Sequence, residues 1–465
     1  MSLQPGSIAA RDAAAILHPM VNPGVIEDRG ALMIERGEGV YVWDNTGKQY
    51  IEGLAGLWST ALGYGNKELA QVAHDQIVKM SFTHMFNGKS HETAMLLAER
   101  LKALVPVPNA SKVFFGCSGS DANDTQVKLA WFYNNAIGRP QKKKIIGRVK
   151  GYHGITIASG SLTGLPPMHN QWDLPLDCGR FIHTDCPHHY RFAEKGESEE
   201  DFATRLANNL EQLILREGPD TVAAFIAEPV MAAGGVLPPP KTYFEKIQAV
   251  LRKYDVLFIA DEVVTGFGRT GNPFATHTYG LTPDTMTLAK ALTSSYQPLS
   301  AVILPEKMYG PIAEAGRKLG TIGHGYTYTG HPVCAAVALK CLEIYERDRI
   351  FERAAQLSTK FQARLHAFAD HPLVGEIRGV GMIGAVEFVS NKKTKAGFNP
   401  PGSIGVYAFE RCHAHGLIPR NVGDGIAFCP PLIITEAQID EIFDKFSLAL
   451  ADTLDYVTRE GLLAA

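Results

Sequence analysis

Short apolar runs alternate with longer amphipathic stretches through the middle of the chain, and this alternation restricts the fold more than any other feature. The runs are a few residues long and rich in β-branched or aromatic side chains, which is typical of buried strands. Amphipathic stretches over 122–137 and 243–254 lie between some of them and predict helices. Such alternation favours an α/β fold with a mainly parallel sheet and helices on both faces. The predicted strands are 112–115, 144–149, 221–227, 256–260, 285–288 and 300–304.

Both ends of the chain have a different pattern. Short apolar segments over 30–55 surround the turn sequence at 44–47, which predicts a small antiparallel hairpin region. A helix is expected over 333–347, followed by a mixed α+β tail. We therefore predict a large domain over residues 61–327 and a small α+β domain made of residues 1–60 with 328–465.

The overall charge and the apolar segments restrict the partners of the protein. The 465 residues include 45 Lys and Arg against 48 Asp and Glu, a formal net charge of −3. This near balance argues against nucleic acid or an anionic membrane as the main partner. The longest apolar stretch, 222–240, is interrupted by Glu228 and Pro229, so we expect no membrane-spanning segment.

The N-terminus and the cysteines indicate a cytoplasmic setting. The first 20 residues lack the basic region of a secretory signal and contain Asp12 before their only short apolar run. The seven cysteines are scattered and form no CxxC pair, which argues against a disulfide framework or a zinc ribbon. A reduced, cytoplasmic protein is therefore expected.

Glycine is more frequent than usual. The chain has 45 glycines, whereas an average usage of about 7% predicts about 33. Several stand beside the motifs described below, and we expect them to lie where the backbone approaches a bound ligand closely. They are Gly116, Gly119, Gly154, Gly234, Gly235, Gly266, Gly268, Gly271, Gly323, Gly325 and Gly330.

Polar side chains follow several predicted strands, at the sheet edge where open parallel sheets bind ligands. Lys290 comes two residues after a strand among apolar neighbours, and burial would lower its pKa as Schiff-base chemistry requires. The alternative is a lysine that extends to the surface. Asp261 directly follows another strand, where a buried carboxylate would pair with a cation such as a protonated pyridine nitrogen. The alternative is a carboxylate that caps a turn.

A third motif opens the helix predicted over 122–137. The sequence Ser118-Gly-Ser-Asp-Ala-Asn123 follows a strand, and its small residues let the backbone approach a ligand. The N–H groups of a first helical turn suit a phosphate. A simple Ser or Asp helix cap has the same sequence, so both interpretations stay open.

Two further motifs resemble other kinds of site. Residues 266–271 match GxGxxG, but no long helix follows and no acid lies about 20 residues further on, as dinucleotide binding requires. We therefore predict a turn-rich active-site loop. Cys186, His188 and His189 share one proline-containing loop without the paired spacing of a structural zinc site, so no metal site is predicted.

In their order and spacing, the motifs resemble those of class III pyridoxal-phosphate-dependent aminotransferases of fold type I. Within this family the chain is similar to the ω-amino acid or amine:pyruvate transaminases. The resemblance implies pyridoxal 5'-phosphate as cofactor and a mainly parallel seven-stranded sheet flanked by helices in the large domain. The motifs that carry it are 56–58, 118–123, 152–154, 227–229, 261–262, 266–271, Lys290, 326–332 and Arg420.

The resemblance also implies roles for residues of the cofactor site. Lys290 would form the Schiff base with the cofactor and move the substrate proton, and Asp261 would pair with the pyridinium nitrogen. Tyr152 would stack on one face of the ring and Val264 on the other, with Tyr152 counted among the catalytic residues. The remaining cofactor contacts would come from Gly119, Ser120, His153, Glu228 and, across a subunit boundary, Thr327.

The substrate contacts follow from the same resemblance. Arg420 would bind the carboxylate of a keto acid as a bidentate fork and swing aside for a bulky apolar amine. Two positions depart from the family pattern, because Met20 stands where an aromatic residue is frequent and Arg420 precedes Asn421 and Val422. The expected pocket residues are Met20, Leu57, Trp58, Ala233, Arg420 and, from the other subunit, Phe86.

The resemblance therefore predicts a transaminase with a ping-pong cycle. It would move an amino group from an ω-amino acid or amine to pyruvate, or to a similar keto acid or aldehyde. Shared sites imply a homodimer, with a tetramer left open. The alternatives are a decarboxylase or aminomutase of the same fold and a non-catalytic protein that binds the cofactor.

Overall fold

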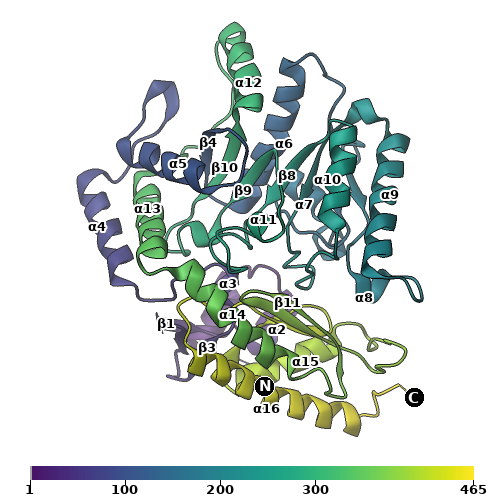
Figure 1. Ribbon diagram of the computed structural model, residues 1–465. Helices are drawn as coiled ribbons and strands as arrows, with labels where there is room; N and C mark the ends of the chain where they lie inside the picture. The colour runs from purple at the N-terminus through teal and green to yellow at the C-terminus, as the bar shows by residue number, and fades with distance from the viewer. Residues whose placement is uncertain (1–2, 465) are drawn as a thin grey trace.

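Seven strands form the central sheet, in the order β4-β10-β9-β8-β7-β5-β6 (Figure 1). The computed structural model describes residues 3–464. Strand β10 is antiparallel to both of its neighbours, whereas the other four pairs are parallel. The predicted mainly parallel sheet is therefore confirmed. Its strands are β4 (Ala110–Gly116), β5 (Lys144–Arg148), β6 (Phe181–Thr184), β7 (Val222–Ala227), β8 (Leu257–Asp261), β9 (Thr285–Leu288) and β10 (Ser300–Pro305).

The sequence pattern identified six of these strands and missed β6. Each predicted run lies within two residues of the observed strand at both ends. Strand β6 has only four residues, lies at the edge of the sheet and includes His183, whose Nε2 lies 3.0 Å from the Leu162 carbonyl oxygen. A short edge strand with a polar residue has too little apolar character to stand out.

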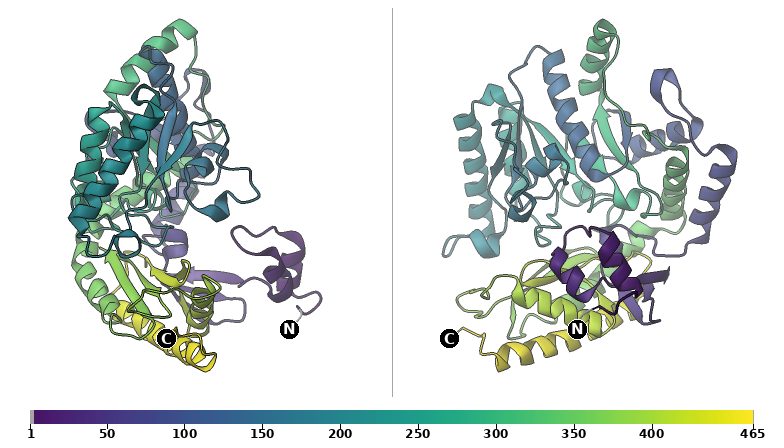
Figure 2. Two further views of the ribbon diagram at one scale, coloured as in Figure 1. Left: turned by 90° about the vertical axis from the view of Figure 1, so that its right-hand side faces the viewer. Right: turned by 180° about the vertical axis from the view of Figure 1, so that it is seen from behind.

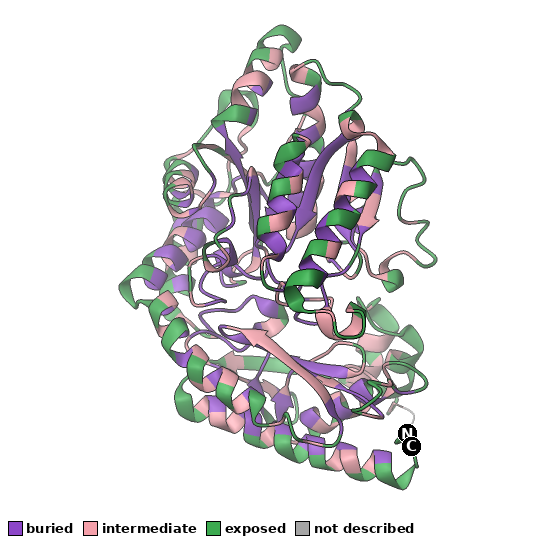
Figure 3. Cartoon of the chain, turned by 45° about the vertical axis from the view of Figure 1, so that its right-hand side comes forward, coloured by how far each residue is buried: buried purple, intermediate pink, exposed green. Residues whose placement is uncertain are grey.

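Helices cover both faces of the central sheet, so its strands are apolar on both sides. On β7, Phe225 packs in the same cluster as residues of α9 and α10, whereas Ala224 and Ile226 pack in the cluster that includes residues of α6 and α7. Figure 3 shows the buried strands between helices with exposed outer faces. The helices between the strands are α4 (Lys67–Met80), α5 (Glu92–Leu104), α6 (Gly119–Ala136), α7 (Ile157–Leu162), α8 (His189–Phe192), α9 (Glu199–Glu217), α10 (Tyr243–Lys253), α11 (Ala275–Thr278) and α12 (Glu306–Leu319), with short 3-10 turns at Phe86–Gly88, Pro166–Met168, Pro219–Thr221 and Lys290–Leu292.

Two four-stranded sheets lie at the other end of the molecule and bring the two ends of the chain together (Figure 1). Their orders are β1-β2-β3-β13 and β11-β12-β15-β14, and the predicted hairpin region is β1 to β3. Strands β3 and β13 pair in parallel, with Ile51 opposite Leu417. A small α+β domain built from both termini is thus confirmed, while the limits 60/61 and 327/328 stay predictions. The strands are β1 (Ile34–Glu38), β2 (Tyr41–Asp44), β3 (Gln49–Glu52), β11 (Val374–Val380), β12 (Ile383–Phe388), β13 (Leu417–Ile418), β14 (Arg420–Asn421) and β15 (Gly425–Phe428), and the helices are α3 (Ala55–Trp58), α13 (Pro332–Arg347), α14 (Ile350–His366), α15 (Ser403–Ala414) and α16 (Glu436–Arg459).

The first two helices stand away from the body of the molecule in the side view of Figure 2. They are α1 (Ile8–Ala15) and α2 (Pro23–Arg29), and neither has a buried residue. The side chains of Ser7 and Asn22 cap them by accepting N–H groups of the first turn. Within residues 3–464, no helix has both the length and the apolar character needed to cross a membrane.

Candidate active site

A cavity of about 820 Å³ opens at the carboxyl ends of the parallel strands. Its walls also include the turn after β3 and strand β14, so both domains contribute to it. Most of the predicted site residues line this cavity, although they come from segments that are far apart in the sequence. The predicted residues that line the cavity are Met20, Leu57, Trp58, Gly119, Ser120, Tyr152, His153, Glu228, Ala233, Asp261, Val264, Lys290 and Arg420.

Lys290 follows β9 and lines the cavity. Its Nζ has no hydrogen-bond or ion-pair partner among residues 3–464. Burial lowers the pKa of this amine, although the carboxylates of Asp261 and Glu228 oppose the shift. The side chain therefore does not extend to the outer surface but presents an amine that loses its proton more readily than an ordinary lysine.

Asp261 ends β8 and is 3% exposed. Its Oδ2 accepts a hydrogen bond from Asn123 Nδ2 at 2.8 Å and lies 2.8 Å from His153 Nδ1. Its Oδ1 accepts the N–H of Val263 at 3.1 Å, so the carboxylate also caps the turn. No lysine or arginine pairs with it in the described part of the chain. A buried carboxylate held in this way suits a cationic group of a ligand.

The N-terminus of α6 faces the same cavity. Ser118 accepts the N–H of Asp121, and the Asp121 side chain accepts that of Ser118, so the helix-cap interpretation is confirmed. Gly119 and Ser120, in the first turn, line the cavity. Because first-turn N–H groups have no partner within a helix and lie at its positive end, the cap is compatible with the predicted phosphate site, which stays a prediction.

Glu228 connects two loops of the cavity wall. Its carboxylate accepts the N–H of Tyr152 at 3.0 Å and that of Ala232 at 3.0 Å, next to Ala233. The side chain is 4% exposed, and burial raises its pKa. Glu228 therefore positions the aromatic ring of Tyr152 relative to the loop that bears Ala233.

The rest of the cavity combines an apolar wall with one cation. Leu57, Trp58 and Ala233 supply the apolar side. The Nε of Arg420 is buried and has no hydrogen-bond partner within residues 3–464, and burial lowers the pKa of its guanidinium. Met20 is 64% exposed on the cavity wall, so its thioether leaves that side open.

Phe86 and Thr327 do not line the cavity of their own chain. Phe86 is 45% exposed, and Thr327 is also exposed. The two segments lie near each other, because a Cβ added to Gly325 would stand 3.0 Å from the Phe86 ring. Their assignment to the site of a second subunit stays a prediction.

Several wall residues were not predicted as site residues. Asn123 belongs to the motif 118–123 and lies on the face of α6 that meets the sheet, which was the available signal. Others come from irregular segments, such as Leu165 and Met168 before β6 and a stretch from Thr293 to Leu299 after β9. Such loops have no periodicity from which their placement is predictable.

Three features of the cavity fit pyridoxal 5'-phosphate, which combines an aldehyde, a ring nitrogen and a phosphate. For the aldehyde, Lys290 offers an amine that has no partner in the described part of the chain. Asp261 offers, for a protonated ring nitrogen, a buried carboxylate that no lysine or arginine of residues 3–464 neutralises. The start of α6 offers N–H groups for the phosphate. The donor set of this chain is therefore suited to the cofactor.

The glycine motif 266–271 is a run of turns, as predicted, but its placement in the active site is wrong. None of its residues lines the cavity. A Cβ added to Gly268 would stand 2.7 Å from the Phe351 ring, and Arg269 donates hydrogen bonds to the carbonyl oxygens of Met382 and Pro430. These glycines allow the loop to pack closely against the small domain.

The broader expectation that the surplus glycines surround a ligand is confirmed at two positions and wrong at six, whereas Gly323, Gly325 and Gly330 lie beside Thr327 and stay predictions for a second subunit. Of the eleven, only Gly119 and Gly154 line the cavity. A Cβ on Gly154 would stand 2.6 Å from Ser120 Oγ, and one on Gly234 would stand 2.3 Å from the Lys150 carbonyl oxygen. Close contact between protein segments, more than contact with a ligand, accounts for these positions.

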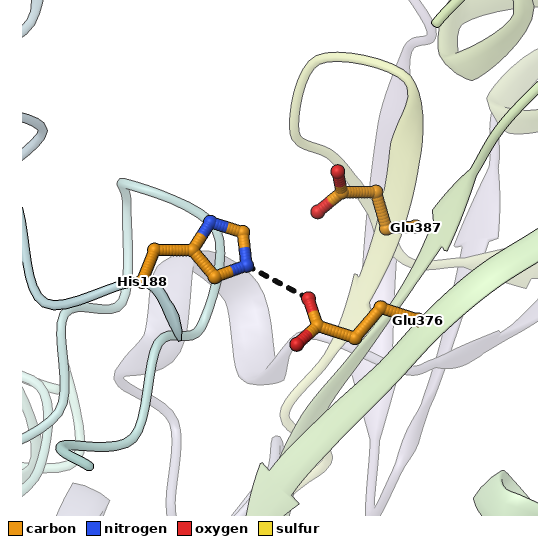
Figure 4. Close-up of side chains that lie close together, drawn as sticks. All are labelled: His188, Glu376 and Glu387. Carbon is orange, nitrogen blue, oxygen red and sulfur yellow. Dashed lines mark hydrogen bonds and ion pairs between the residues drawn. The ribbon is translucent and has the colours of Figure 1, made fainter. Parts of the chain in front are cut away.

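The three side chains considered as metal ligands in one loop have separate partners. Cys186 packs in an apolar cluster with Met231 and Leu237. His189 Nε2 lies 2.9 Å from the Glu197 carbonyl oxygen. His188 Nε2 lies 2.7 Å from Glu376 Oε2, as Figure 4 shows.

His188, Glu376 and Glu387 lie close enough for a cation, with ligand atoms within 4.8 Å of one another (Figure 4). However, Arg378 Nη1 donates to Glu376 at 2.7 Å and to Glu387 at 2.5 Å, and Arg191 Nε donates to Glu387 at 2.5 Å. Two guanidiniums balance the two carboxylates. The group is therefore an ion network that joins the loop after β6 to β11 and β12.

Several known proteins are similar to this chain over most of its length. The family model "Aminotransferase class-III" matches residues 25–450. Gamma aminobutyrate transaminase 3, chloroplastic, of Solanum lycopersicum is 51% identical over 92% of this chain and 82% of its own length. Vanillin aminotransferase of Capsicum annuum is 48% identical over 94% of this chain and 95% of its own length. The ω-transaminase of Pseudomonas jessenii in complex with PMP is 53% identical, with a TM-score of 0.96 over 97% of this chain and 99% of that one.

Proposed function

Because the chain belongs to the class-III aminotransferase family, we propose that it moves an amino group from an ω-amino acid or amine to pyruvate, or to a similar keto acid or aldehyde. The chain is a pyridoxal-phosphate-dependent aminotransferase, and the identity of donor and acceptor is the proposal. A ping-pong cycle fits one cavity that serves both substrates in turn.

The residues of the cavity have separate roles in the transfer of the amino group. Bound pyridoxal phosphate supplies an electron sink for the charge that develops on the substrate carbon. Lys290, an amine with a lowered pKa, accepts the proton from that carbon and returns it. Asp261 keeps a positive charge on the ring nitrogen, while Asn123 and His153 hold the carboxylate in place. Gly119 and Ser120 bind the phosphate.

The proposal depends most on one observation: an arginine that has no hydrogen-bond partner within residues 3–464 lies beside an apolar wall. Arg420 suits the carboxylate of a keto acid or ω-amino acid, whereas Leu57, Trp58 and Ala233 suit an apolar amine. The names of relatives support such a range, since they include γ-aminobutyrate transaminases, vanillin aminotransferase and variants engineered for bulky amines.

Initial rates test this proposal. The holoenzyme is assayed with pyruvate and, in turn, γ-aminobutyrate, β-alanine and 1-phenylethylamine, while alanine is quantified. We expect alanine to form with at least one donor, and parallel double-reciprocal plots when both substrates are varied. Release of carbon dioxide, or turnover of an amino aldehyde without any keto acid, would instead favour the decarboxylase or aminomutase alternative.

Replacing Arg420 with leucine is expected to raise the KM for pyruvate about 10- to 100-fold. Hydrogen bonds to a charged group contribute about 1.5–3 kcal/mol, and leucine removes them while it keeps an apolar surface. The control is an aliphatic aldehyde acceptor without a carboxylate, whose KM is expected to change less than about threefold on the same argument. Equal losses with both acceptors would contradict a carboxylate-binding role.

We also propose a homodimer, because Phe86 and Thr327 are exposed and lie outside the cavity of their own chain. Sedimentation of the holoenzyme measures this directly. A cytoplasmic location remains a proposal from the cysteine pattern, whereas the names of the plant relatives place those proteins in chloroplasts or mitochondria.

A further inference from the structure

A strained turn directly after β3 carries two residues of the cavity wall. Residues 55–58 form α3, but Ala55 and Trp58 have φ angles of 52° and 62°, in the left-handed region. Residues with a side chain adopt this region only when the surrounding contacts hold them there. Leu57 and Trp58 both line the cavity, so the contacts that hold the turn also determine the shape of the wall.

Glu52, the last residue of β3, contacts the beginning of this turn. Its Oε1 accepts the N–H of Leu54 at 3.1 Å, and its Oε2 accepts the hydroxyl of Tyr64 at 3.1 Å. The same hydroxyl lies over Gly56, where an added Cβ would stand 3.4 Å from it. Glu52 thus binds the residue that precedes the turn, and the Tyr64 hydroxyl, which Glu52 holds, packs against the centre of the turn.

Glu52 is a buried acid that the transfer reaction does not use. It is 4% exposed and does not line the cavity, and no cation pairs with it within residues 3–464. The titratable groups that face it are the Tyr64 hydroxyl and the Cys429 thiol, whose pKa values burial also raises. Burial raises the pKa of Glu52 to about 7. A protonated carboxyl group can donate to Tyr64 and still accept from Leu54, and glutamine can do the same.

We propose, on the basis of the proposed amine transfer, that Glu52 and Tyr64 are positioning residues that fix residues 54–58 and thereby limit the size of amine that the cavity accepts. Trp58 is 3% exposed and packs in one cluster with Leu54, Val230 and Val264. A wall that is both packed and hydrogen-bonded excludes a large substituent, because close-packed side chains do not move aside without loss of contacts. Release of the turn would let Trp58 move and would admit larger amines.

Three variants test this proposal in the holoenzyme, Glu52→Ala, Tyr64→Phe and Glu52→Gln. The readout is the ratio of kcat/KM for β-alanine to that for 1-phenylethylamine, with pyruvate as acceptor. We expect the alanine and phenylalanine variants to lower this ratio at least fivefold, mainly through KM, and the glutamine variant to stay within twofold of the wild type. A glutamine variant that behaves like the alanine variant would contradict positioning by hydrogen bonds.

The same hairpin offers a matched control. Asp44 is also buried, and its carboxylate accepts the Tyr50 hydroxyl at 2.8 Å and the N–H groups of Thr46 and Lys48. None of these residues lines the cavity. Tyr50→Phe therefore removes an equivalent hydrogen bond without touching residues 54–58. Its donor ratio is expected to stay within twofold of the wild type. If Tyr64→Phe changes thermal stability as Tyr50→Phe does but leaves the donor ratio unchanged, the pair has only a structural role.

Amide hydrogen exchange separates this inference from the proposed function. In Tyr64→Phe, we expect the amides of residues 54–58 to exchange about three- to tenfold faster than in the wild type, as loss of one hydrogen bond allows. Unchanged exchange would overturn the inference even if both amines react. If the wild type accepts neither amine, the proposed function fails, while faster exchange still shows that Glu52 and Tyr64 hold the turn.

Discussion

Replacement of Lys290 with alanine is expected to reduce kcat about 10²- to 10⁴-fold, which is the contribution of a positioned proton-transfer group. Lys290 is the one lysine of the described chain that lines the cavity. Its amine has no competing partner within residues 3–464, and burial lowers its pKa, so it gives up a proton more readily than an ordinary lysine and can then accept one from the substrate. Alanine removes the proton carrier and leaves the other groups of the wall in place. The measurement is kcat with saturating donor and pyruvate.

A second buried lysine provides the control. Lys142 is 3% exposed and donates to the carbonyl oxygens of Tyr254 and Asp255, outside the cavity. Lys142→Met is expected to lower the unfolding temperature while kcat of the folded holoenzyme changes less than about threefold, because it removes hydrogen bonds without altering the site. Full turnover by Lys290→Ala would refute the assignment of Lys290.

Asp261→Asn is expected to lower kcat/KM by about 10²- to 10³-fold. Removal of one partner of a buried charge pair costs about 3–5 kcal/mol, and here the partner is the protonated ring nitrogen of the bound cofactor. Asparagine has nearly the same shape, but only one of its two terminal atoms accepts hydrogen bonds. It therefore cannot keep all the contacts that Asp261 makes with Asn123, His153 and Val263. The measurement combines kcat/KM with the cofactor concentration needed for half-maximal activity.

Asp284→Asn is the control that separates the loss of negative charge at the site, expected in Asp261→Asn, from a general loss of stability. The Asp284 carboxylate accepts the N–H of Phe258 at 2.8 Å, at the end of β8 remote from Asp261. This variant is expected to lose stability while its cofactor requirement stays unchanged. If Asp261→Asn also loses only stability, the carboxylate does not act on the ring nitrogen.

Local patterns in the sequence predicted the central sheet and the polar residues at its edge. Apolar runs are strong signals where both faces of a strand are buried, as in β8 and β9. Asp261 ends β8, and Lys290 comes two residues after β9. The resemblance to a family added Leu57, Trp58 and Arg420, which no local pattern connects to the sheet. These residues reach the cavity because β3 pairs with β13, more than 350 positions later in the chain.

The errors have a common physical cause. The glycines at 266–271 and at Gly234 match expectations for ligand contact, but the contacts that exclude a side chain there come from other protein segments. A glycine in the sequence indicates that the backbone is close to other atoms, but it does not show whether those atoms belong to a ligand or to the protein. Likewise, the role of Glu52 depends on its hydrogen bond with Tyr64 and on the left-handed turn between the two residues. No sequence motif predicts either feature.

The central claim is that one cavity receives an amino group from a donor, stores it and delivers it to a keto acid. Absorbance of the purified holoenzyme tests this claim in two separate steps. On addition of an amine donor alone, the cofactor band is expected to shift by an amount equivalent to one amino group per site, and pyruvate is expected to restore it and release an equal amount of alanine. An unchanged band across γ-aminobutyrate, β-alanine and 1-phenylethylamine, or a shift that pyruvate does not reverse, would contradict the account.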